Sequence, residues 1–113
     1  MKNKTFNDLI EKQFQTCWET LEQKRSEYAP DDDRLQNFRK AANLQGFKTV
    51  AKAVKGMSAK HTVAWADYIS RIENGDTSIP WEEIEEKSQD QINYILLEKA
   101  ALLEWYLKND ISK

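Results

Sequence analysis

Apolar residues recur every three or four positions along most of the chain. This spacing places side chains on one face of an α-helix, and it predicts four helices separated by short polar segments. The first helix is expected over about 5–27, with Thr5 and Asp8 as a capping box. It ends before Pro30, because the residue that precedes a proline leaves the helical region.

The boundaries of the next two helices follow from their terminal residues. The acidic run at 31–33 is expected to cap the second helix, since carboxylates complement the helix dipole at its N-terminus. Gly46 is a natural stop for that helix. The third helix is expected to begin after Thr49 and to end in the turn at 74–76.

The fourth helix opens near Pro80 and becomes apolar on nearly all sides after Ile92. Such a helix is central in its bundle or buried in an interface. In a chain of 113 residues with only four helices, this pattern favours a second copy. The sequence therefore predicts an all-α single domain over 1–113, arranged as an antiparallel bundle of about four helices and dimeric.

The net charge of −2 conceals a strong segregation of charge. Residues 34–66 carry seven basic side chains and no acid, whereas residues 67–104 carry ten acids against three basic side chains. A basic segment without acids suits phosphate groups. It is equally compatible with basic and acidic helices that pack side by side and neutralise one another.

Composition excludes several classes of protein. No apolar run is long enough to cross a bilayer, and no apolar stretch follows the basic N-terminus as it would in a signal peptide. Cys17 and His61 are the only cysteine and histidine, so the chain forms no internal disulfide and no Cys/His zinc site. We expect a cytoplasmic protein.

Polar residues at the start of the fourth helix are candidates for a metal site. Glu86, Asp90 and Asn93 share one face, and oxygen ligands of this kind suit Mg²⁺. A third carboxylate would have to come from elsewhere, with Asp67 and Glu27 as candidates. The alternative is that these acids are solvated surface residues.

The third helix carries candidates for phosphate contact. Lys48, Lys52 and Lys55 form one basic row that could hold a triphosphate or could equally be a solvated face. Lys60 and His61 are candidate catalytic residues, although a histidine on an apolar stripe is commonly a packed edge residue.

A series of short motifs lies between about residues 20 and 105. They are Lys24-x-x-x-Tyr28, Asn37-Phe38, Ala41-Ala42 before Gly46, Gly56-Met57-x-x-Lys60-His61, Asp67, and Glu86-Lys87-x-x-Asp90-x-x-Asn93-Tyr94. Together these motifs resemble small phage and prophage helical proteins with the nucleotide modification associated domain. More remotely, they resemble the MazG-like all-α nucleoside triphosphate pyrophosphohydrolases.

The MazG-like enzymes hold Mg²⁺ with carboxylates on two antiparallel helices and cleave the α–β phosphate bond of a nucleotide. The resemblance implies that Glu86 and Asp90 hold the metal, although their spacing is four rather than three. The third helix carries Lys60, His61 and Asp67 where these enzymes carry Glu-x-x-Glu.

Two functions follow as hypotheses. The first is a phage-type nucleotide-handling protein, in its most specific form an Mg²⁺-dependent nucleoside triphosphate pyrophosphohydrolase. The alternative is a non-enzymatic phage protein that binds a host factor such as a defence nuclease, because the chain is rich in the aromatic residues that anchor interfaces. Direct nucleic-acid binding ranks third, since the chain is acidic overall and shows no recognition motif.

Overall fold

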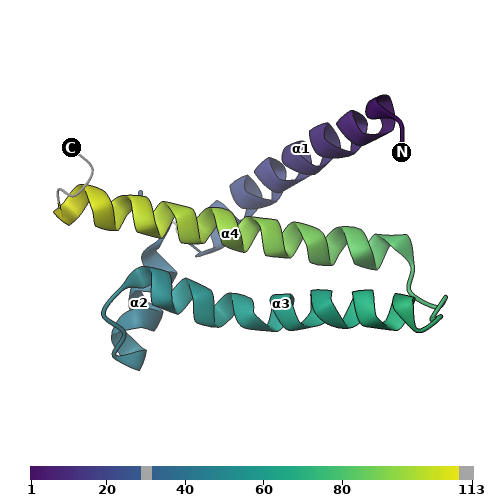
Figure 1. Cartoon of the computed structure of the whole chain (residues 1–113). Helices are drawn as coiled ribbons and strands as arrows, with labels where there is room; N and C mark the ends of the chain where they lie inside the picture. The colour runs from purple at the N-terminus through teal and green to yellow at the C-terminus, as the bar shows by residue number, and fades with distance from the viewer. Residues whose placement is uncertain (29–31, 110–113) are drawn as a thin grey trace.

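The computed structural model describes residues 1–28 and 32–109, and this part of the chain is helical without a strand (Figure 1). The all-α prediction is therefore confirmed. The helices are α1 (Asn3–Tyr28), α2 (Gln36–Gln45), α3 (Val50–Glu73) and α4 (Trp81–Asn109). Within the described residues, no helix is both long enough and apolar enough to span a membrane.

Two of the predicted helix caps are present. The Thr49 hydroxyl accepts a hydrogen bond from the Lys52 backbone N–H at 3.2 Å, which satisfies one unpaired donor at the start of α3. Gly46 ends α2 at a φ of 72°, in the left-handed region that glycine adopts without strain.

The N-terminal caps predicted for α1 and α2 are wrong. α1 begins at Asn3, and Asp8 pairs with Lys4 at 2.8 Å instead of capping. α2 begins only at Gln36, after an N-cap residue that has no side-chain hydrogen bond. Asp33 lies before α2, where its Oδ1 accepts a hydrogen bond from the Leu35 backbone N–H at 3.1 Å and its Oδ2 accepts one from Arg39 Nε at 2.7 Å. Asp31 lies outside the described residues.

α3 and α4 form the main packing unit. They lie side by side along most of their length, while α2 packs against α3 and α1 packs against α4 (Figure 1). α1 crosses α4 at an angle, and its N-terminal end diverges from the α3–α4 pair (Figure 1). The four helices therefore meet most closely where α1 ends, beside α2.

The buried core is small for a chain of this length. Val54 and Cys17 are the largest side chains that are fully buried among the described residues. The other buried apolar residues are Leu35, Ala42, Ala53, Tyr68 and Ala101. The Sγ of Cys17 accepts a hydrogen bond from Gln13 Nε2 at 3.3 Å. The burial of Cys17 fits the packing role expected on the apolar side of α1.

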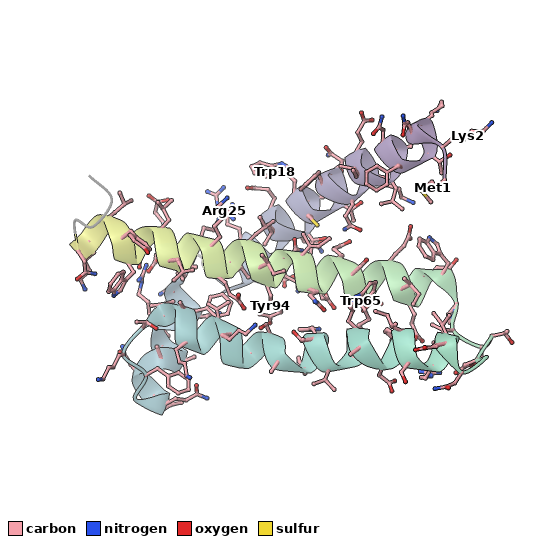
Figure 2. The ribbon with its side chains drawn as sticks, in the orientation of Figure 1. Met1, Lys2, Trp18, Arg25, Trp65 and Tyr94 are labelled. Carbon is pink, nitrogen blue, oxygen red and sulfur yellow. The ribbon has the colours of Figure 1, made fainter. Side chains whose placement is uncertain are left out.

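Large apolar side chains remain exposed on α1 and α4. We define the α4 apolar face as six residues between 38% and 67% exposed: Ile95, Leu96, Leu102, Leu103, Tyr106 and Leu107. On α1, Phe14 and Trp18 are more than 60% exposed, and Trp18 points away from α4 (Figure 2). One copy of the described chain thus leaves a continuous part of its longest apolar helix uncovered.

Candidate ligand pocket

A pocket of about 250 Å³ opens where all four helices meet. Its charged lining consists of Lys24, Arg25, Arg34 and Asp90. The remaining lining is formed by two amides, two aromatic rings and three aliphatic side chains: Asn37, Asn93, Phe38, Tyr94, Leu21, Met57 and Leu97. Concave sites with apolar walls and a few convergent polar groups are typical of small-molecule binding.

Helical periodicity explains why these side chains converge. Residues that are three or four positions apart share one face of a helix. Each of three segments contributes at this spacing: Leu21, Lys24 and Arg25; Arg34, Asn37 and Phe38; Asp90, Asn93, Tyr94 and Leu97. The basic members lie at the end of α1 and just before α2, whereas the carboxylate and one amide lie on α4.

Positive charge gathers at one side of the pocket. Arg34 Nη2 lies 2.6 Å from Glu22 Oε1, and Arg25 Nη1 lies 3.6 Å from Glu22 Oε2. Counting Lys24 and Asp90, the group retains one positive charge in excess. Arg25 is a surface side chain, 57% exposed, so its donors can turn toward a bound anion.

His61 and Asp90 face each other at the edge of this pocket. His61 Nδ1 and Asp90 Oδ2 are 3.6 Å apart, and both side chains are largely buried. His61 also stacks on Tyr94, with ring centroids 5.0 Å apart. Figure 2 shows Tyr94 in the space between α4 and α3.

The surroundings of His61 favour its neutral form. Burial lowers the pKa of His61 below its usual value, and Asp90 opposes this effect. Lys60, Lys87 and Lys24 lower the pKa further, which shows that these cations surround the His61–Asp90 pair.

Asn93 is the buried polar residue of the pocket. The residue is only 7% exposed, and its Oδ1 has no hydrogen-bond partner within residues 1–28 and 32–109. A buried amide oxygen without a partner costs free energy of about 1–3 kcal/mol. A bound ligand that donates a hydrogen bond to this oxygen would explain why it is buried without a partner.

The structure separates the residues that were predicted to hold a metal. Asp90 lines the pocket, but Glu86 and Glu27 are exposed and lie outside the pocket lining. Asp67 is 62% exposed and lies 3.8 Å from Arg71 on the surface of α3. Within the described part of the chain, no three His, Cys, Asp or Glu side chains form a group that could hold a metal ion.

The predicted phosphate row also lies away from the pocket. Lys48, Lys52 and Lys55 are exposed, and none of them belongs to its lining. Lys60 is exposed too, beside His61. The cations of the pocket come instead from Lys24, Arg25 and Arg34, which charge counting along the sequence did not distinguish from other surface cations.

The residues of the quoted motifs converge on the pocket only in part. Seven of the seventeen line it: Lys24, Asn37, Phe38, Met57, Asp90, Asn93 and Tyr94. Searches with protein-family models, and of curated proteins and solved structures, found no significant match to this chain. The lining residues themselves therefore indicate what the pocket binds.

Proposed function

We propose that this protein binds a nucleotide in the pocket between its four helices. The observation that carries the proposal is the composition of that pocket, where three cations, two amides and two aromatic rings converge. Cations suit the phosphate of a nucleotide, and aromatic rings and amides suit its base. The resemblance to nucleotide-handling phage proteins supports the same chemistry.

The size of the pocket favours a single nucleotide. Its volume of about 250 Å³ lies just below the roughly 300–1,000 Å³ that ligand sites commonly span. A polymer would require an extended basic groove, whereas the cations here gather around one cavity. In the proposed complex, the phosphate contacts Lys24, Arg25 and Arg34, and the base enters toward α4.

Hydrolysis is the more specific form of this proposal. Mg²⁺ commonly uses one or two protein carboxylates together with the phosphates of its substrate. Asp90 is the carboxylate that lines the pocket, so a Mg²⁺-dependent pyrophosphohydrolase would need the opposite pose, in which the phosphates and the ion rather than the base lie against Asp90. His61 lies 3.6 Å from that carboxylate and could orient it. The proposed nucleotide binding does not depend on hydrolysis, and binding and hydrolysis can be measured in separate assays.

Calorimetric titration tests the proposal directly. Nucleoside mono-, di- and triphosphates are added to the protein with and without Mg²⁺, and product formation is followed by chromatography. Replacement of Arg25 by Gln should weaken binding by roughly tenfold, because it removes one charge-assisted contact with phosphate. Lys52→Gln is the matched control, since Lys52 is exposed outside the pocket. Failure of every nucleotide to bind would refute the proposal.

We also propose that a second copy covers the α4 apolar face. At ~200 Å² for a fully exposed large side chain, its six residues expose roughly 600 Å². Homodimer interfaces are about 65% apolar, so this face corresponds to roughly 900 Å² from each copy. That area matches the ~800 Å² per partner of a stable interface. The second copy would complete the antiparallel bundle expected from the sequence.

Analytical ultracentrifugation tests the dimer with a surface substitution. Leu103→Lys should shift the equilibrium toward monomer, because it places a charge within the proposed interface while the residue is already 58% exposed in one copy. Val63→Lys makes a comparable change at a 69% exposed site on α3 and should leave the dimer intact. If the wild-type protein remains a monomer at high concentration, the proposed dimer is contradicted. The α4 apolar face would then be available to a host protein, as the alternative function requires.

A further inference from the structure

The pocket presents two hydrogen-bond acceptors on one face of α4: the Oδ1 of Asn93, which is buried, and the carboxylate of Asp90, whose side chain is 22% exposed. Asp90 and Asn93 are three residues apart, so their side chains lie on the same side of the helix. An ionised Asp90 can only accept hydrogen bonds. Among the described residues, the His61 ring lies beside it, with Nδ1 3.6 Å from Asp90 Oδ2, which is longer than a hydrogen bond. The Oδ1 of Asn93 has no partner in the same part of the chain.

A ligand that satisfies both residues must bring donors to them. The rings of Phe38 and Tyr94 line the same pocket as both acceptors, so aromatic surface that suits a planar base is present there. The cations that suit phosphate come from the other side of the pocket, at the end of α1 and before α2. This polarity orients a nucleotide with its base toward α4.

Nucleobases differ in the donors that they can offer. Guanine presents a ring N–H beside an exocyclic amino group, while adenine and cytosine each present an amino group with two hydrogens. Uracil presents one ring N–H flanked by two carbonyl oxygens. Those oxygens would repel an ionised carboxylate and leave a buried acceptor without a donor, which is costly.

We propose that the pocket selects nucleotides whose base carries an exocyclic amino group, with Asp90 and Asn93 accepting its protons. This inference rests on the proposed nucleotide binding and adds the choice of base. Carboxylates accept hydrogen bonds from base amino groups in the same way in nucleic-acid recognition. A site built to bond a polar group rejects analogues that lack it.

Two pairs of ligands test the amino group. Guanosine and inosine monophosphates differ by the 2-amino group alone. Cytidine and uridine monophosphates exchange an amino group for a carbonyl, and N3 changes from an acceptor to an N–H donor, so the first pair is the decisive one. Titration of the wild-type protein should give about tenfold tighter binding for the amino-bearing member of each pair. Asp90→Asn should reduce both ratios toward one, because the amide places an N–H where the carboxylate offered only oxygens.

Asp8→Asn is the matched control, since Asp8 is 61% exposed on α1 and outside the pocket. Asp8→Asn should keep the affinity ratios of the wild type within each pair of ligands. Two results would overturn the inference: affinity ratios near one in the wild-type protein, or affinity ratios in Asp90→Asn that equal those of the wild type. If all four monophosphates bind equally well, the proposed selection of amino-bearing bases is refuted while the proposed nucleotide binding is supported. If none binds, the proposed function fails as well. Should Asp90→Asn not fold, the wild-type ratios still decide.

Discussion

Two valines on α3 provide a test of the fold with an internal control. Val54 is fully buried, whereas Val63 is 69% exposed on the same helix. Replacing either residue by alanine removes the same two methyl groups and gains the same small helix propensity, roughly 0.5 kcal/mol. The difference between the two variants therefore isolates the contribution of burial at Val54.

The expected cost at Val54 follows from its burial. Two buried methyl groups contribute ~1.6 kcal/mol in transfer free energy. A cavity of their size adds about 1 kcal/mol when the surroundings relax only in part. After the gain in helix propensity, Val54→Ala should lower the free energy of unfolding by ~2 kcal/mol. Val63→Ala should leave it unchanged or raise it by up to ~0.5 kcal/mol.

Urea unfolding followed by circular dichroism measures both values, with all proteins at one concentration because a dimer would couple stability to concentration. A lowered midpoint for Val54→Ala with an unchanged slope would match the expected loss of core packing. Equal midpoints for the two variants would refute the packing of α3 described above, because they would place Val54 in an environment as exposed as that of Val63.

Further predictions concern Gly56 and His61. Gly56→Ala should raise the free energy of unfolding by about 1 kcal/mol, because a Cβ at this α3 position meets no atom within 4 Å; a loss of stability in the same urea assay would contradict that open surrounding. The lowered pKa of His61 means that the unfolded chain takes up a proton first, so this contribution to stability is complete above about pH 6.5 and is lost as the pH falls toward the folded-state pKa. His61→Gln should flatten the stability profile below about pH 7, and an unchanged slope in urea titrations there would exclude His61 as its source.

Much of the fold could be predicted from local sequence. The spacing of apolar residues indicated four helices, and Thr49 and Gly46 marked two boundaries because their capping chemistry depends on adjacent residues. Asp33 misled the prediction for α2, because its carboxylate bonds the Leu35 backbone N–H in the turn before the helix, and α2 begins only at Gln36. Arg39 also pairs with Glu104, a contact 65 positions away that no local pattern reveals.

The candidate site could be predicted only in part. Asp90 and Asn93 were singled out because their spacing places them with Glu86 on one face of the fourth helix, although they were assigned there to a metal site. The basic partners were missed, because Arg25 and Arg34 resemble ordinary surface residues until the packing of α1 and α2 places them opposite α4. The spacing of three and four within each lining segment was a usable signal. It could not say which faces meet, since that depends on how the helices pack.

Nuclear magnetic resonance titration tests the central claim most directly, because it locates the ligand on the chain. Guanosine monophosphate is added to ¹⁵N-labelled protein, and the amide signals are followed. Binding in the pocket predicts the largest changes at Lys24 and Asp90 and in the side-chain amide of Asn93, with Lys48 and Lys52 unaffected. Changes confined to the Lys48–Lys52 row, or no change at saturating ligand, would contradict a nucleotide pocket between the four helices.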